Sequence, residues 1–183
     1  MSTEVLVDGI YFTFPNADAV HIFDDSAQYN DVKGWGIKGC DIVLLKNDEL
    51  WLIEVKDYTY PGASQPQDLV ATLASKISGT LGMLHIWSRS ENDGDAYEFA
   101  RRCAKAKRIH AALHVEPKDG GRKEKQVQAV LMPLQGKINM VGKSMKLQGA
   151  LVSSTFAPND NAAWTSRRDP TKRAAHQDRS SPL

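Results

Sequence analysis

Two short runs near the middle of the chain are apolar at nearly every position, and a polar segment separates them. Residues 41–45 (DIVLL) and 50–56 (LWLIEVK) are rich in aliphatic and β-branched side chains, and residues 46–49 (KNDE) supply a turn. Strands that are apolar on both faces are typical of the interior of a sheet. The pattern therefore predicts a buried β-hairpin over these residues.

The rest of the apolar pattern alternates between strands and helices. Residues 5–14 fit a strand or a hairpin broken at Asp8 and Gly9, and residues 19–23 fit a strand or a helical turn. Helices are predicted over residues 68–87 (with Asp68 as N-cap), 95–107 and about 134–145, and strands over 109–115 and 147–155. This order predicts an α/β fold with a mixed central β-sheet flanked by helices.

The composition changes after Phe156. Residues 157–183 are rich in Asp, Asn, Arg, Ser and Pro and have few apolar anchors, which predicts a disordered basic tail behind a domain of residues 1–156. The whole chain of 183 residues is 42% hydrophobic and 25% charged. These values fit one soluble domain with a tail, and they exclude a fibrous or wholly disordered protein.

Charge, cysteines and targeting signals add few constraints. The net charge is +1, so an argument for a polyanionic partner must be local. Cys40 and Cys103 form no C-x-x-C pair and give no support for a disulfide framework or a zinc site. Residues 69–87 are long enough to span a membrane but contain Lys76 and several other polar residues. With no signal peptide in the N-terminal residues, we expect a soluble cytoplasmic protein without a membrane partner.

The predicted hairpin brings charged residues together. A two-residue turn at Asn47 and Asp48 places Asp41 opposite Glu54, with their Cβ atoms roughly 4.5–5.5 Å apart. Lys56 follows Glu54 by two residues and therefore points to the same face. Because the other residues on this face are apolar, two opposed carboxylates are unfavourable there unless something compensates their charge.

A divalent cation would compensate that charge. Mg²⁺ prefers carboxylate and carbonyl oxygens, so Asp41, Glu54 and the main-chain carbonyl of Val55 are the candidate ligands of Mg²⁺ or Mn²⁺. Lys56 would then hold or activate a water molecule, or stabilise charge on a phosphate. The alternative is an ordinary sheet on which these charged residues are solvated and bind nothing.

The segment 38–58 (KGCDIVLLKNDELWLIEVKDY) resembles the core motif of the PD-(D/E)XK nuclease superfamily. Asp41 matches the first acidic residue of that motif, and Glu54-Val55-Lys56 follows after a spacer of twelve residues. The resemblance implies a restriction-endonuclease-like core and metal-dependent hydrolysis of phosphodiester bonds in nucleic acid, with DNA favoured. It places Lys56 beside the attacking water.

The sequence also departs from the motif. Cys40 stands where many members have proline, and no acidic residue lies on a clear helix upstream of Asp41. Asp24 and Asp25 are the candidates for that upstream acid, so the number of metal ions stays open between one and two.

Lys76 is the only charged residue in the predicted helix between residues 69 and 87, and it shares a helix face with Thr80. In the fold that the resemblance implies, the helix after the motif packs beside the active site, so Lys76 is a candidate auxiliary catalytic residue. The alternative is that its ammonium group extends past the helix into solvent.

A basic segment lies further along the chain. Residues 95–125 carry nine Lys or Arg against five acidic residues. Within it, Arg101, Arg102, Lys105 and Lys107 are candidate phosphate contacts for a nucleic-acid partner, and the alternative is a solvated helix face.

Two functional hypotheses follow. The first is a Mg²⁺-dependent or Mn²⁺-dependent endonuclease. The second is a catalytically silent module of the same fold that binds nucleic acid or serves as an accessory subunit of a larger defence or repair complex, as a homodimer or beside a partner protein.

Overall fold

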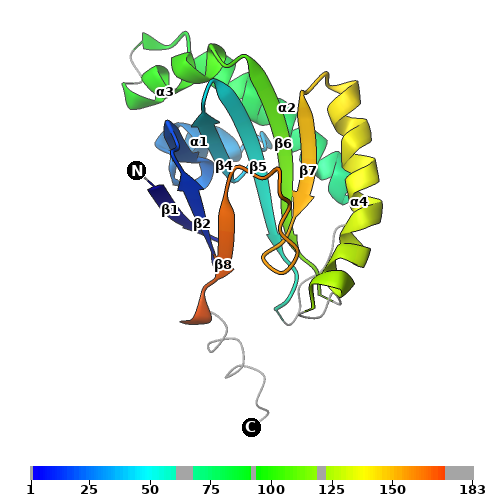
Figure 1. Cartoon of the computed structure of the whole chain (residues 1–183). Helices are drawn as coiled ribbons and strands as arrows, with labels where there is room; N and C mark the ends of the chain where they lie inside the picture. The colour runs from blue at the N-terminus through cyan, green and yellow to red at the C-terminus, as the bar shows by residue number, and fades with distance from the viewer. Residues whose placement is uncertain (1, 61–67, 92–93, 119–122, 172–183) are drawn as a thin grey trace.

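The centre of the fold is a five-stranded mixed sheet in the order β3-β4-β5-β6-β7 (Figure 1). We describe it from a computed structural model covering residues 2–60, 68–91, 94–118 and 123–171. The strands are β3 (Ala19–Ile22), β4 (Ile42–Lys46), β5 (Glu49–Asp57), β6 (Arg108–Glu116) and β7 (Gly149–Ser153). The first three are antiparallel, and β6 and β7 continue parallel to β5. The predicted α/β fold with a mixed sheet is therefore confirmed.

The β4–β5 hairpin has the predicted register. Leu45 pairs with Leu50 and Val43 with Leu52. Asn47 and Asp48 both have positive φ angles, 52° and 61°, as a two-residue turn that follows the twist of the strands requires. One step beyond the pair of Ile42 with Ile53, this register sets Asp41 against Glu54.

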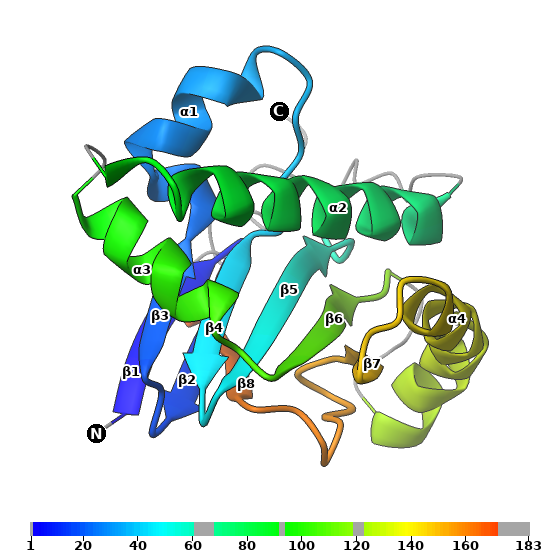
Figure 2. The ribbon, with the colours of Figure 1, turned by 90° about the horizontal axis from the view of Figure 1, so that it is seen from above.

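Helices cover the face of the sheet that carries Val43, Leu52 and Leu113 (Figure 2). They are α1 (Ala27–Lys33, after a 3₁₀ turn at Phe23–Asp25), α2 (Leu69–Trp87), α3 (Asp95–Ala104) and α4 (Glu124–Ser144). The Asp68 side chain caps α2 by accepting a hydrogen bond from the Ala71 N–H at 2.8 Å. Within the described ranges, α2 alone is long and apolar enough to cross a membrane, a test that core helices of soluble proteins also pass.

Helix α4 begins ten residues before the predicted start, and Pro133 lies inside it. Its core-facing apolar positions continue on both sides of the proline: Val127, Leu131, Leu134, Ile138 and Val141. This spacing of three and four residues was the sequence signal for the longer helix. The helix continues through the proline because burying such a stripe outweighs one lost backbone hydrogen bond.

A second, three-stranded sheet covers the opposite face. It consists of β1 (Ser2–Val7), β2 (Ile10–Pro15) and β8 (Thr165–Arg168), in the order β1-β2-β8. Residues 5–14 thus form part of a hairpin, with the turn at Asp8 and Gly9 as predicted. Phe12, Phe14 and Trp164 pack between the two sheets against Trp51.

The predicted disordered tail is wrong for residues 157–171. Trp164 is buried, and Arg168 at the end of β8 donates a hydrogen bond to the Asp57 carboxylate at 2.6 Å. One aromatic anchor and one ion pair hold a strand whose composition is otherwise polar. Residues 172–183 of the predicted tail lie outside the described residues.

A buried acid at the end of β6 holds the segment that follows β7. Glu116 is 1% exposed and accepts hydrogen bonds from the Thr155 N–H at 2.6 Å and the Ser154 hydroxyl at 3.0 Å. The Nε2 atom of His114 lies 3.2 Å from the same carboxylate. Burial alone would raise the pKa of Glu116, but the His114 and Thr155 hydrogen bonds outweigh burial and lower it.

We expect Glu116→Gln to lower the free energy of unfolding at neutral pH by on the order of 1–3 kcal/mol, because the amide loses hydrogen bonds that the carboxylate accepts. Since folding lowers the pKa of Glu116, its charge contributes stability above the unfolded-state value of 4.5 and loses that contribution as the pH falls. The difference between wild type and variant should therefore shrink below that pH. Urea unfolding at pH 7 and pH 3.5 measures it, and a constant difference would contradict the assignment.

Candidate active site

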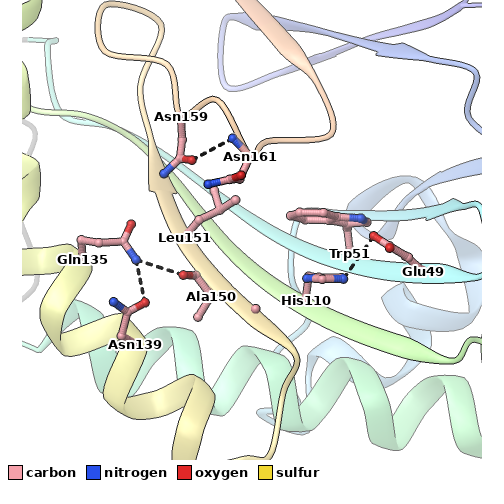
Figure 3. Close-up of a pocket in the computed structure, with 10 residues that line it drawn as sticks. Glu49, Trp51, His110, Gln135, Asn139, Ala150, Leu151, Asn159 and Asn161 are labelled. Carbon is pink, nitrogen blue, oxygen red and sulfur yellow. Dashed lines mark hydrogen bonds and ion pairs between the residues drawn. The ribbon is translucent and has the colours of Figure 1, made fainter.

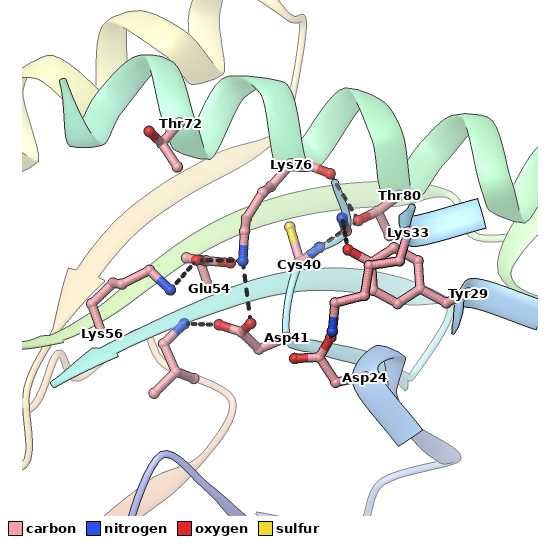
Figure 4. A network of polar contacts seen from close by, with 12 residues as sticks. Asp24, Tyr29, Lys33, Cys40, Asp41, Glu54, Lys56, Thr72, Lys76 and Thr80 are labelled. Atoms are coloured by element: carbon pink, nitrogen blue, oxygen red, sulfur yellow. Dashed lines mark hydrogen bonds and ion pairs between the residues drawn. The ribbon is translucent and has the colours of Figure 1, made fainter. Parts of the chain in front are cut away.

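Four residues that the sequence singles out converge on one cluster (Figure 4). The Nζ atom of Lys76, on α2, lies 3.2 Å from Asp41 Oδ1 and 2.7 Å from Glu54 Oε1. The Nζ atom of Lys56 lies 2.7 Å from the same oxygen of Glu54. The two carboxylates therefore lie on one side of the sheet and are close enough to contact a single cation. Lys76 points into the cluster, as expected for an auxiliary residue of the site, and the alternative that its ammonium group extends past the helix into solvent does not hold.

Burial strengthens the electrostatic interactions among the charged groups of this cluster. The Glu54 side chain is fully buried, whereas the side chains of Asp41, Lys76 and Lys56 are 11%, 16% and 27% exposed. Burial and the nearby Asp41 raise the pKa of Glu54 to about 7, against the lowering effect of the two ammonium groups. For Lys76, burial favours the neutral amine, but attraction by Glu54 and Asp41 dominates and raises its pKa. Lys76 is therefore held in its charged form.

Hydrogen bonds fix the position of Asp41. Its Oδ2 atom accepts a hydrogen bond from the Val55 N–H at 2.7 Å. The preceding residue, Cys40, donates its N–H to the Thr80 hydroxyl at 2.8 Å, and this hydroxyl donates to the Lys76 carbonyl at 2.8 Å. Thr80 thus ties the start of β4 to the helix turn that carries Lys76, and in this way it positions the site.

Helix α2 reaches the site because residue 79 is a glycine. A Cβ atom at Gly79 would lie 1.9 Å from the main-chain oxygen of Lys38. The backbone of residues 38–40 therefore passes directly against α2, one helical turn from Lys76. A side chain at residue 79 would push the helix and its lysine away from the two carboxylates.

The predicted basic residues lie elsewhere. Arg101, Arg102, Lys105 and Lys107 are all exposed, on α3 and the turn that follows it. Lys107 pairs with Asp48 at 2.9 Å, beside the start of β5, whereas Glu54 and Lys56 lie near its end. The structure therefore does not bring these four residues to the carboxylate cluster.

The segment around α1 contributes residues that the sequence did not assign. Asp24 pairs with Lys33 at 2.8 Å and does not complete the site as an upstream acid. The hydrogen bond and the charge of Asp24 raise the pKa of Lys33. The Tyr29 hydroxyl accepts a hydrogen bond from the Gly39 N–H at 3.0 Å. Residues 18–38 lack a clear period, which is why only the structure places them here.

The donor set fits a hard divalent cation with water as its remaining ligands. Asp41 and Glu54 already share the Lys76 ammonium, and the buried Oε2 atom of Glu54 has no hydrogen-bond partner among the described residues. Within the same residues, no group of three or more His, Cys, Asp or Glu side chains could hold a metal. Mg²⁺ is commonly held by only one or two carboxylates and several waters, so two carboxylates suffice.

A cavity of about 600 Å³ lies away from this cluster, beside β7 at the edge of the sheet, and residues of α4 as well as of the sheet line it (Figure 3). Trp51 and His110 line one side, stacked with ring centroids 4.2 Å apart. On the other side, the Gln135 side chain donates to the Ala150 carbonyl at 2.9 Å and accepts from the Val152 N–H at 2.7 Å. The cavity contains none of the predicted site residues.

Comparisons of the chain with protein families, curated proteins and solved structures find no match. The carboxylate cluster and the motif that forms it are therefore the features that point to a function.

We expect Gly79→Ala to destabilise the fold by on the order of 1–3 kcal/mol, because the new methyl group meets the Lys38 carbonyl. Gly82, on the same helix, has open space around it, so Gly82→Ala should stabilise by about 0.5–1 kcal/mol through helix propensity. Urea unfolding followed by circular dichroism measures both. Equal effects of the two substitutions would contradict the close approach of α2.

A double-mutant cycle tests the ion pair between Lys76 and Glu54. Lys76→Met leaves a buried carboxylate with less compensation, and Glu54→Gln leaves the lysines with less negative charge. The double variant should therefore be more stable than the sum of the single effects predicts, with a coupling of about 1–3 kcal/mol. Unfolding free energies of the four proteins at pH 8 give this coupling, and additive effects would contradict a shared buried pair.

Proposed function

We propose that this protein is a metal-dependent nuclease with a restriction-endonuclease-like core of the PD-(D/E)XK type, acting on phosphodiester bonds of nucleic acid, with DNA favoured. The observation that carries the proposal is the convergence of Asp41 and Glu54 on one cation position, with Lys56 beside them. The mixed sheet and the helix packed over its end agree with such a core.

Each residue has a separate task in this proposal. Asp41, Glu54 and the main-chain carbonyl of Val55 would hold Mg²⁺ or Mn²⁺. Such an ion activates a water molecule near neutral pH and stabilises charge that develops on the phosphate. Lys56 is the more exposed of the two lysines, so its ammonium group is the one that orients the attacking water or contacts a phosphate oxygen. Lys76 compensates the charge of both carboxylates and holds them together.

One observation favours the second hypothesis, a catalytically silent module. Two ammonium groups already face two carboxylates, so the cluster is electrically balanced without a metal. In that case the four residues stabilise the fold, and the domain binds nucleic acid or acts as an accessory subunit.

Cleavage assays on the full-length chain separate the two hypotheses. We expect wild type to cut plasmid or single-stranded DNA with Mg²⁺ or Mn²⁺ and not with EDTA. Asp41→Asn and Lys56→Met should each lower the rate by about 100-fold or more, since each removes a group that faces developing charge. Asp48→Asn and Lys137→Met are matched controls at exposed positions outside the cluster and should leave the rate unchanged.

Calorimetric titration of Mg²⁺ or Mn²⁺, with and without DNA, completes the test. Metal binding by wild type that Asp41→Asn abolishes supports the nuclease proposal. Cleavage that persists in both site variants would contradict it, because the activity would then come from elsewhere. DNA binding with neither cleavage nor metal binding would favour the silent module.

A further inference from the structure

One tryptophan differs from the other three in its exposure. Trp35 is 81% exposed, whereas Trp51, Trp87 and Trp164 are only 4–6% exposed. Exposing an indole to water forgoes the burial that stabilises the other three. An aromatic ring held in this way is available to a ligand.

Hydrogen bonds hold the turn that presents Trp35. This turn follows α1, and its N–H groups at Trp35 and Gly36 donate to the carbonyls of Val32 and Lys33 at 3.0 Å and 3.2 Å. Gly36 has a φ of +80°, a conformation that favours glycine. The Tyr29 hydroxyl donates to the Ile37 carbonyl at 3.4 Å and ties the turn back to α1. A hydrogen-bonded turn therefore presents the Trp35 indole at the surface.

The same turn leads directly into the candidate active site. Lys33, two residues before Trp35, is exposed and pairs with Asp24 (Figure 4). On the other side, the carbonyl of Lys38 packs against Gly79 of α2, and the chain then reaches Asp41. Trp35 thus lies between Lys33 and Lys38 in the chain, three residues before the Lys38 carbonyl that packs against α2.

An exposed indole flanked by cations suits an unpaired nucleobase. Bases stack on aromatic side chains with little dependence on sequence, while lysines contact the adjoining phosphates. In a duplex the base faces are covered by their neighbours, so the indole discriminates in favour of single strands, loops or frayed ends. We propose that Trp35 is a stacking platform for an unpaired base of the substrate, beside the candidate active site. This inference deepens the proposed function and rests on its nucleic-acid substrate.

Tryptophan emission tests the proposal, because an aqueous quencher reaches Trp35 far more readily than the three buried tryptophans. We expect single-stranded oligo-dT, added to the full chain in EDTA, to reduce the acrylamide-accessible emission. Trp35→Ala should remove this response and weaken single-strand binding on the order of 10- to 100-fold at fixed salt. Trp35→Phe should restore most of the affinity. Met132→Ala, at another exposed apolar residue on α4, should leave binding unchanged. A duplex of the same length should lose little affinity in Trp35→Ala.

Unchanged single-strand affinity in Trp35→Ala would overturn the inference, and so would equal losses for single strand and duplex or no binding of nucleic acid by wild type. The measurement in EDTA separates this result from the proposed function. If cleavage persists while Trp35→Ala binds normally, the platform is wrong and the nuclease proposal stands. If wild type never cleaves but binds through Trp35, the catalytic proposal is wrong and the platform stands.

Discussion

The burial of two neighbouring carboxylates against an apolar sheet is the constraint on which the rest of the structure depends. Glu54 has no exposed surface, and Asp41 contacts the same cationic group, the Lys76 ammonium. A pair of like charges in such a place is stable only if positive charge reaches it. Lys76, the one charged residue of α2, provides that charge. The hairpin register, the close passage of residues 38–40 and the glycine at residue 79 together allow it to do so.

Two buried acids at the same end of the main sheet show how surroundings separate structural from chemical roles. Glu116 accepts hydrogen bonds from Ser154 and Thr155 and lies beside His114, and its pKa is lowered. Glu54 is compensated by ion pairs at Oε1, has no hydrogen-bond partner at its buried Oε2 among the described residues, and has a raised pKa. A carboxylate whose oxygens all accept hydrogen bonds holds chain segments together. A carboxylate with an oxygen that accepts none retains the capacity to bind a ligand.

Local patterns predicted the features that depend on neighbouring residues in sequence. The turn at Asn47 and Asp48 determined the hairpin register, and through it the approach of Asp41 to Glu54. The Asp68 cap fixed the start of α2. These features follow from turn chemistry, side-chain alternation and capping, which a single sequence carries.

Features that depend on distant contacts were not predictable in the same way. Pro133 suggested a helix boundary, yet the buried stripe of α4 continues through it. β8 is polar and is held by Trp164 and by the pairing of Arg168 with Asp57. The edge of β7 is another such case, because the Gln135 amide bonds the Ala150 carbonyl and the Val152 N–H, and the Asn159 amide bonds the Val152 carbonyl. These contacts occupy main-chain groups that an added strand would need, so β7 is protected against pairing with a strand of another chain.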